Sequence, residues 1–227
     1  MGFVDLLKER AKKSIKTIVL PETEDMRTLE ATDKILKEGV AKIVLIGNEE
    51  EINKKAAEGG FDISGATIVD PETSDRTQAY IDKFVELRAK KGMTPEKAKE
   101  ILHTQYPYYG VMMVKMGDAD GMVSGACHST ADTLRPCLQI LKTKPGTKLV
   151  SAFFLIVVPD CEYGANGAFV FADSGLNQNP TPEELSAIAA SSAESFQLLV
   201  EEEPIVAMLS HSTKGSAKHP DVDKMVE

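Results

Sequence analysis

The sequence predicts an α/β protein with a mostly parallel sheet that helices cover on both faces. Short apolar segments alternate along the chain with longer segments of helical period. The apolar segments are continuous rather than alternating with polar residues, which is typical of strands buried on both faces. Because parallel crossovers are right-handed, an open, doubly wound sheet is the expected arrangement.

The first part of the chain predicts a short amphipathic helix, followed by alternating strands and helices. Residues 17–20 form the first strand, and the segments AKIVLI and ATIVD form the next two. We expect the helix after the first strand to end with Gly39 as its cap, and a second helix to follow in EEINKKAAEGG. TQAYIDKFVELRAKKG predicts a longer helix, and Thr94 with Pro95 predicts the start of another.

The middle of the chain predicts a strand and a capped helix that enclose a polar loop. An apolar helix or helix end in YYGVMMVKMG precedes a strand at residues 121–124. We expect the next helix at residues 134–142, with Asp132 or Thr133 as its N-cap and Pro136 in its first turn.

The last third of the chain predicts further strands and one clear helix. LVSAFFLIVVPD is the strongest strand signal, and GAFVFAD predicts another. TPEELSAIAASSAESFQLLV predicts a helix that Thr181 caps, and residues 204–209 predict a further buried strand. The chain stops within an apparent helix start, HPDVDKMVE, which suggests a fragment or a chain completed elsewhere.

Composition excludes several classes of function. With 227 residues and a net charge of −9, the chain lacks the basic face that binding to nucleic acid requires. The chain contains no run of 18 apolar residues, so the sequence predicts no membrane span. Its N-terminus does not fit the pattern of a signal peptide. The three cysteines form no C-x-x-C pair, so we expect a reducing, cytoplasmic setting.

The segment SGACHST raises three possibilities: a metal site, a nucleophile with its base, or a backbone cradle for an anion. Adjacent residues on a strand point to opposite faces, so Cys127 and His128 are expected neither to share a metal nor to act as a catalytic pair. We expect Cys127 and Cys137 to be small buried apolar residues, and we expect no bound metal.

A backbone cradle fits the same segment better. Small residues after a strand, followed by a helix N-terminus, supply N–H groups for an anion. Ser129, Thr130 and Arg135 could add donors. The alternative, a surface loop with a capped helix, stays open on these residues alone.

A second polar loop, LSHSTKGSAKHP, follows the strand predicted at residues 204–209. Ser212, Thr213 and Lys214 are candidates to bind an anionic ligand, because ligands of open α/β sheets bind beyond the carboxyl ends of strands. A solvated loop is the alternative. Together with LPETED and Arg27, the two loops favour a single cleft.

Several segments together resemble the phosphate acetyl/butyryltransferase family, specifically phosphate acetyltransferase (phosphotransacetylase). The resemblance runs from the first strand to the last residue and lies in these segments: LPETED with Arg27, Asp120 to Pro136, SAFFLIVVPDCEYG, FADSGLNQNPT and AMLSHSTKGSAKH. It implies a homodimer of two-domain, three-layer α/β/α subunits like those of isocitrate and isopropylmalate dehydrogenases. Residues 1–145 would then form an N-terminal domain completed by a C-terminal segment absent here, and residues 146–227 would begin a second, truncated domain.

The resemblance also implies the reaction acetyl-CoA + phosphate = CoA + acetyl phosphate, by direct attack of the CoA thiolate. CoA is a substrate, and no cofactor or metal is implied. Cys161 matches a cysteine near the site, Ser129 and Thr130 match a hydroxyl-rich loop, and the general base, an aspartate, is expected outside these residues. Three arginines match positions that bind CoA or phosphate: Arg27, Arg88 and Arg135.

Two rival functions remain open. A phosphate butyryltransferase would differ in its acyl pocket. The second rival is a non-catalytic regulatory module that binds acetyl-CoA, like the related domain fused to some malic enzymes. A start at Met1 with no preceding dehydrogenase domain argues against this module.

Overall fold

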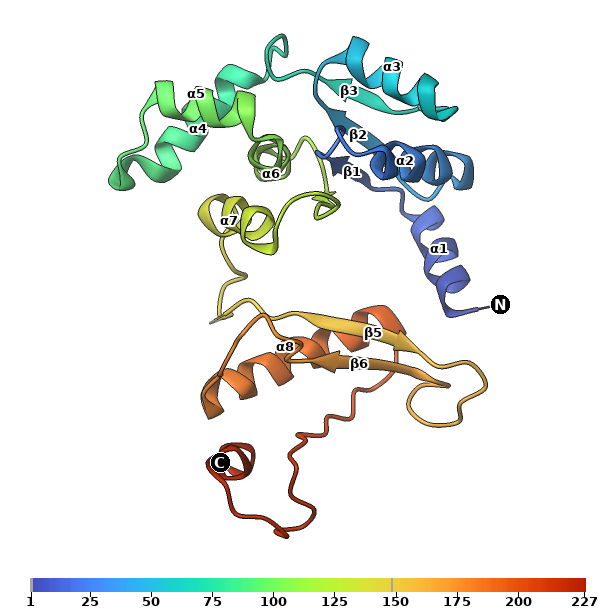
Figure 1. Ribbon diagram of the computed structural model, residues 1–227, viewed down its shortest axis with the longest axis vertical. Coiled ribbons are helices and arrows are strands. Elements are labelled where there is room, and N and C mark those ends of the chain that lie inside the picture. Colours follow the sequence, from blue (N-terminus) through green and yellow to red (C-terminus); the bar gives the residue numbers. More distant parts are fainter. Residues whose placement is uncertain (1, 148) are drawn as a thin grey trace. The chain divides into compact units, whose positions relative to one another are not determined.

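The computed structural model describes residues 2–147 and 149–227 and divides the chain into two compact units (Figure 1). One unit is Val4–Lys142, and the other contains Thr143–Glu227. The two units have different sheets, so the first unit's parallel sheet and the second unit's strand pair form separately.

The first unit is built on a four-stranded sheet in the order β3-β2-β1-β4, and every pair of neighbours is parallel. Crossovers through helices link successive strands, as the sequence predicts for a doubly wound sheet. The fourth strand ends two residues earlier than predicted. The strands are β1 (Thr17–Leu20), β2 (Lys42–Ile46), β3 (Thr67–Val69) and β4 (Gly121–Met122).

The helices of this unit begin and end largely where their capping residues predict. Gly39 adopts the left-handed conformation after α2, and Thr94 caps α5, which has Pro95 in its first turn. Within the described residues, no helix of the chain is long and apolar enough to span a membrane. The elements are α1 (Phe3–Lys13), α2 (Met26–Glu38), α3 (Glu49–Gly59), α4 (Thr77–Arg88), the 3-10 turn η1 (Ala89–Lys91), α5 (Pro95–Thr104), α6 (Tyr106–Met116) and α7 (Thr130–Ile140).

Two apolar clusters cover the two faces of the parallel sheet. Val19, Val44 and Ile46 pack with residues of α4, α5, α6 and α7. The intervening strand residues Leu20 and Leu45 pack instead with residues of α2 and α3. Because successive side chains of a strand point to opposite faces, this division confirms three layers, helices on each side of the sheet.

The start of α7 corrects the sequence prediction. The helix begins at Thr130, four residues before the predicted start, and its N-cap is Ser129 rather than Asp132 or Thr133. The Ser129 side chain accepts the Asp132 backbone N–H at 3.2 Å and so satisfies one open donor of the first turn. Pro136 therefore lies inside the helix, where it removes one backbone hydrogen bond, and not in its first turn.

The second unit contains a pair of strands and a long helix. β5 (Phe153–Val157) and β6 (Ala168–Ala172) are antiparallel, so this pair differs from the parallel arrangement of the first unit. α8 (Pro182–Val200) packs against β6, and Thr181 with Glu184 forms a capping box at its start, confirming the predicted cap. The short helix α9 (Pro220–Val226) ends the chain.

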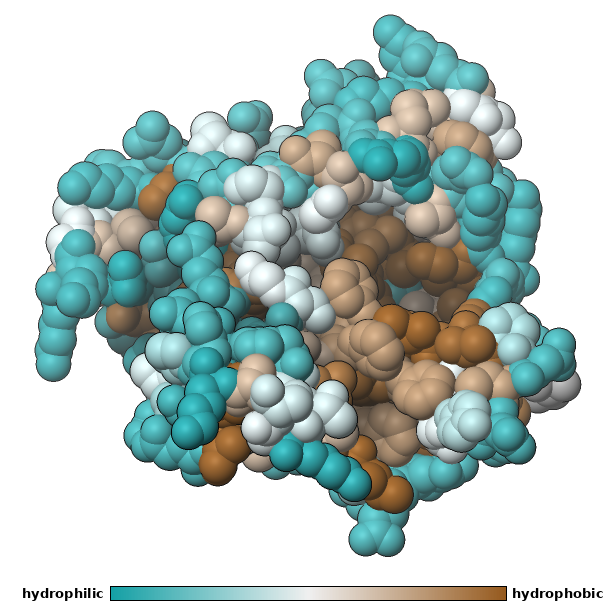
Figure 2. Space-filling view, turned by 60° about the horizontal axis from the view of Figure 1, so that its bottom comes forward, coloured by the Kyte–Doolittle hydropathy of each residue, from teal (hydrophilic) through white to brown (hydrophobic). Residues whose placement is uncertain are grey.

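The predicted buried strand at residues 204–209 is wrong. This segment has no regular secondary structure, and Ile205 and Leu209 are 97% and 79% exposed. A strand needs a neighbour to accept its backbone hydrogen bonds, and no described strand pairs with it. Figure 2 shows apolar side chains, in brown, gathered at the surface that faces the viewer.

Candidate functional site

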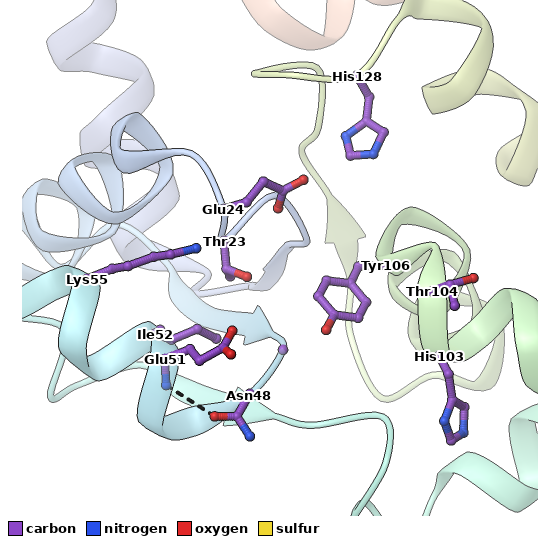
Figure 3. A pocket seen from close by; sticks show the side chains of 11 residues that line it. Thr23, Glu24, Asn48, Glu51, Ile52, Lys55, His103, Thr104, Tyr106 and His128 are labelled. Carbon is purple, nitrogen blue, oxygen red and sulfur yellow. Dashed lines mark hydrogen bonds between the residues drawn. The ribbon is translucent and has the colours of Figure 1, made fainter.

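A cavity of about 460 Å³ lies in the first unit at the carboxyl ends of β1 and β2. This is the edge of an open α/β sheet at which ligands bind. Figure 3 shows the ring of Tyr106 among side chains that come from the loops after both strands and from α3 and α5. The cavity is lined by Thr23, Glu24, Gly47, Asn48, Glu51, Ile52, Lys55, His103, Thr104, Tyr106 and His128.

The floor of this cavity depends on a close approach at Gly47. A Cβ atom there would lie 3.1 Å from Thr23 Oγ1 and 3.2 Å from the Tyr106 ring, and the φ angle is +136°. The Thr23 hydroxyl donates a hydrogen bond of 2.7 Å to the Ile46 carbonyl. A side chain at position 47 would push these loops apart, so a glycine follows β2.

The loop after β4 curls around a carboxylate of this same chain. Glu22, only 2% exposed, follows β1 and accepts four successive backbone N–H groups from residues 125–128. The four distances lie between 2.6 and 2.9 Å, and His128 Nδ1 lies 2.8 Å from Glu22 Oε1. The predicted backbone cradle therefore exists, and the anion in it is the Glu22 side chain.

These hydrogen bonds set the charge state of Glu22. Burial raises the pKa of the carboxyl group, but the backbone N–H groups of Cys127, Ala126 and Gly125 and the ring of His128 together hold that pKa far below its ordinary value. Glu22 is therefore a carboxylate throughout the physiological pH range.

Cys127 and His128 do not point to opposite faces, so the prediction that their side chains cannot meet is wrong. Both residues lie in bends after β4 has ended rather than on a strand, so their side chains converge. Cys127 Sγ lies 3.6 Å from His128 Nδ1 and 3.3 Å from a Glu24 carboxylate oxygen. Cys127 is exposed, so the prediction that it is a buried apolar residue is wrong. Partial desolvation and the carboxylates of Glu24 and Glu22 raise the pKa of its thiol to about 12, so it is protonated at neutral pH.

One group of side chains has the residue types of a metal site. The ligand atoms of Glu22, Cys127 and His128 lie within 4.8 Å of one another, the one such group found among residues 2–147 and 149–227. A metal there would compete with the backbone donors that already surround the Glu22 carboxylate, and it would require loss of a thiol proton with a raised pKa. The donor set therefore fits a metal poorly.

Arg27 lies against the loop that Glu22 holds. Its guanidinium group pairs with both oxygens of Asp25, at 3.0 and 2.6 Å, and donates to the Ala126 carbonyl oxygen. Asp25 is also the N-cap of α2, so one side chain caps the helix and orients the arginine. The Arg27 side chain stays 71% exposed and can reach a ligand.

Arg135 is held on the first turns of α7. Its Nη1 lies 3.0 Å from Asp132 Oδ1, and the other Asp132 oxygen accepts the Ser129 hydroxyl at 2.6 Å. The Ser129 proton is therefore used inside the protein, while Thr130 is exposed at the first position of the helix. The Ser129 hydrogen bond and the charge of Arg135 lower the pKa of Asp132.

Arg88, at the end of α4, shares its surroundings with Arg135. Burial raises the pKa of the Tyr108 hydroxyl, and the positive charges of Arg135 and Arg88 both act to lower it. The charges of the predicted Arg88 and Arg135 therefore both act on the Tyr108 hydroxyl. The Arg88 Nε atom is buried and has no hydrogen-bond partner among the described residues.

The other predicted site residues belong to the second unit. Ser212, Thr213 and Lys214 lie in an exposed turn, in which the Ser212 hydroxyl accepts the Ala217 N–H at 3.2 Å and Lys214 has a φ angle of 49°. This turn follows an irregular segment and not the predicted strand. Cys161 is half-buried in the connection between β5 and β6.

Sequence reasoning missed Glu22, although a signal for it was present. The acidic segment after β1 and the small residues after β4 follow strands that are neighbours in the sheet, so both lie at one edge. A backbone cradle beside an acidic loop can be filled from within the chain. Only the order of the strands in the sheet shows which acidic side chain can reach the backbone N–H groups of the cradle.

Comparisons with known proteins agree over the whole chain. A family model described as phosphate acetyl/butaryl transferase matches residues 2–227. The phosphate acetyltransferases of Acetivibrio thermocellus and Clostridium acetobutylicum are 54% and 51% identical to it, over 100% and 99% of this chain and 68% and 67% of theirs. In solved structures, EutD phosphotransacetylase from Staphylococcus aureus matches with a TM-score of 0.87 and 39% identity, covering 99% of this chain and 65% of that one. A phosphotransacetylase from Streptococcus pyogenes matches with a TM-score of 0.88 and 40% identity, over 99% and 67%. In each of these four comparisons nearly the whole of this chain is matched, but only about two thirds of the relative. The chain thus spans about two thirds of the length of these relatives.

Proposed function

The chain belongs to the phosphate acetyl/butaryl transferase family, and we propose that it takes part in transfer of an acetyl group between CoA and inorganic phosphate. Its substrates are then acetyl-CoA and phosphate in one direction, and CoA and acetyl phosphate in the other. CoA acts as a substrate, and the proposal needs no separate cofactor.

The observation that carries this proposal is that residues 126–132 hold two arginines, Arg27 through the Ala126 carbonyl and Arg135 through Asp132. Arg27 contacts the Ala126 carbonyl, Arg135 lies on α7, and Arg88 acts on the same tyrosine as Arg135. Both substrates carry phosphate groups. A planar guanidinium group binds phosphate oxygens through paired hydrogen bonds and stays charged at every relevant pH, so these arginines suit such ligands.

The chemistry follows from the substrates. The CoA thiol loses its proton to a base, and the thiolate attacks the acetyl carbonyl carbon of acetyl phosphate. A C–S bond forms, and the C–O bond to phosphate breaks with its electron pair leaving on phosphate. Holding two anionic substrates in line supplies much of the rate enhancement of such a step. We propose that Arg27, Arg88 and Arg135, with Ser212, Thr213 and Lys214, supply the binding groups.

The state of Cys127 supports direct transfer. An acetyl-enzyme intermediate on this residue would need a thiolate, whereas its pKa of about 12 keeps the thiol protonated. We therefore expect Cys127→Ser to retain activity. The free thiols Cys127, Cys137 and Cys161 support the proposal of a reducing, cytoplasmic location.

We also propose that the protein works as a homodimer. The side chains of Phe154 and Phe171, opposite each other on β5 and β6, are 62% and 55% exposed, which leaves apolar surface available to a partner. Sedimentation velocity at two protein concentrations checks this proposal, and a monomer at both would contradict it.

One assay tests the proposed reaction and its rivals. CoA is mixed with acetyl phosphate or with butyryl phosphate, and thioester formation is followed as loss of free thiol. We expect acetyl phosphate to be the better substrate; a strong preference for butyryl phosphate would instead assign the butyryl transfer that the family description also includes. In a full-length protein that includes the segment expected to supply the general base, CoA binding without any turnover would favour a regulatory module.

A further inference from the structure

Glu22 is a buried carboxylate whose partners are backbone N–H groups and a histidine. It lies in the loop between β1 and α2, is 2% exposed, and has no salt bridge to a lysine or arginine among the described residues. Its carboxylate instead accepts four consecutive backbone N–H groups, two on each oxygen, from residues 125–128. Such a carboxylate fixes the path of the loop residue by residue.

The contact joins the two loops that follow neighbouring strands. β1 and β4 pair through Ile18 with Gly121 and Val19 with Met122, and the Val123 N–H donates to the Val19 carbonyl just beyond. Beyond this point the hydrogen bonds of Glu22 connect the two loops, whose contacting residues are 103 to 106 positions apart in the sequence. Gly125, with a φ angle of +117°, permits the curl that turns its N–H and the next three toward one point.

The proposed substrate-binding groups depend on this loop from both sides. Arg27 donates to the Ala126 carbonyl, so the loop is one of its two supports, Asp25 being the other. Ser129 follows the loop directly, caps α7 and holds Asp132, which in turn pairs with Arg135. A shift of residues 125–128 therefore moves both arginines.

We propose, resting on the proposed function, that Glu22 is a positioning residue: its buried carboxylate holds residues 125–128 so that Arg27 and Arg135 face the phosphate groups of the substrates. Glutamine is nearly the same size but offers one acceptor oxygen and an NH₂ group, which would meet N–H donors. Because glutamine cannot satisfy donors on both sides, Glu22→Gln releases part of the loop while its side chain still fills the site.

The test compares steady-state kinetics of the enzyme and its Glu22→Gln variant with CoA and acetyl phosphate. Loss of one charge-assisted contact to substrate corresponds to about 1.5–3 kcal/mol, so we expect KM to rise roughly tenfold or more while kcat stays within about threefold. Glu22→Asp keeps both charged oxygens on a shorter side chain. We expect its KM to lie between that of the unmodified enzyme and that of Glu22→Gln. Backbone amide hydrogen exchange is measured in parallel at residues 125–128.

Asp33→Asn is the matched control. Asp33 is also buried, on α2, and its carboxylate contacts Lys37 and the Asp62 N–H but not residues 125–128. We expect it to lower stability and leave both KM values unchanged. If Glu22→Gln leaves KM unchanged, or loses no amide protection at residues 125–128, the positioning role is overturned. If Glu22→Gln does not fold, Glu22→Asp decides by the same two readouts.

The outcome is separable from that of the proposed function. A full-length protein, with the segment expected to supply the general base, that forms no acetyl-CoA refutes the proposed function and, with it, the substrate-positioning role. Amide exchange in the same samples still decides whether Glu22 holds the loop. An active protein with an unaffected Glu22→Gln variant refutes the positioning role alone.

Discussion

The two units of the chain bury their apolar residues to very different extents. In Val4–Lys142, two clusters of buried side chains cover both faces of a parallel sheet. In Thr143–Glu227, the buried apolar residues among those described are Ala168, Leu185, Ile188 and Val222, while Phe154, Leu198 and Ile205 are more than half exposed. Both segments have apolar patterns typical of strands, so pattern alone does not determine burial.

The difference shows what an apolar segment requires in order to become a buried strand. β1 and β2 have neighbours on the hydrogen-bonding edges and helices on both faces. Residues 204–209 have comparable composition but no described neighbour, and they remain irregular and exposed. Because backbone groups and apolar side chains both need partners, the same pattern has different outcomes in the two units.

The largest expected difference is between two phenylalanines. Phe84, in the first unit, is fully buried, and Phe154, in the second, is 62% exposed. We expect Phe84→Ala to lower the free energy of unfolding by about 3–5 kcal/mol, since it leaves a cavity in a packed core. Phe154→Ala should change it by only about 0.5 kcal/mol. Urea denaturation followed by circular dichroism measures both, with amide exchange of α4 and β5 assigning the effect to its unit.

Equal effects of the two truncations would break the comparison. A large loss for Phe154→Ala would mean that this face of β5 is covered in solution, for example in the proposed homodimer. Repeating the measurement across a range of protein concentrations distinguishes these cases, because stabilisation by association depends on concentration.

The next effect concerns the pH dependence of the first unit. In the folded protein the pKa of Glu22 is far below its ordinary value, and in the unfolded chain it is about 4.3. The folded state therefore gains stability from ionised Glu22 above about pH 4.3 and loses that gain as the pH falls toward the folded pKa. We expect Glu22→Gln to cost about 1.5–3 kcal/mol at pH 7 and less at pH 3, measured by urea denaturation at both values.

Glu30→Gln provides the comparison for that experiment. Glu30 pairs with Lys34 on the exposed side of α2, so its removal should cost less than about 1 kcal/mol. A Glu22→Gln cost that is constant from pH 3 to pH 7 would show that ionisation of Glu22 contributes nothing to stability.

The sequence predicted the first unit well because its signals are local and mutually consistent. Gly39 and Thr94 are caps whose effect depends on a few neighbouring residues, and both act as predicted. The three-layer arrangement followed from continuous apolar strands, and the division of Val19 and Leu20 between two clusters confirms it.

The errors arose where a residue's role depends on distant parts of the chain. Cys127 and His128 were treated as strand residues, but the contact of their backbone with Glu22 bends the loop. The cradle at residues 125–128 could be predicted from its small residues, whereas its occupant could not, because Glu22 is more than 100 positions away. Ser129 and Asp132 both fit an N-cap, and only the backbone conformation of Ser129 distinguishes them.

An effect of similar size, on KM rather than on stability, is expected from a substrate-binding candidate of the first unit, with a smaller one from its counterpart in the second. Arg135→Ala removes a planar group that can form paired bonds to phosphate, so we expect the KM for CoA or acetyl phosphate to rise by about ten- to a hundredfold, equivalent to about 1.5–3 kcal/mol. Lys214→Ala should have a smaller effect in the same direction, because an ammonium group acts as a single point charge. Arg135→Lys retains charge and is expected to recover part of the loss. Unchanged kinetics for Arg135→Ala would remove this residue from the site.

The smallest expected effect compares the helix caps of the two units. Ser129 caps α7, and Thr181 caps α8 within a capping box. Replacing either with alanine should cost about 1 kcal/mol, since one backbone N–H of the first turn loses its acceptor. The free energy of opening, measured by amide exchange in the first turn of each helix, reports this loss locally. Thr181→Ala should leave the kinetics unchanged, whereas Ser129→Ala should also raise KM, because Ser129 holds Asp132 beside Arg135. If both variants alter only local opening, the Ser129 hydroxyl acts as a cap and does not help to orient Arg135.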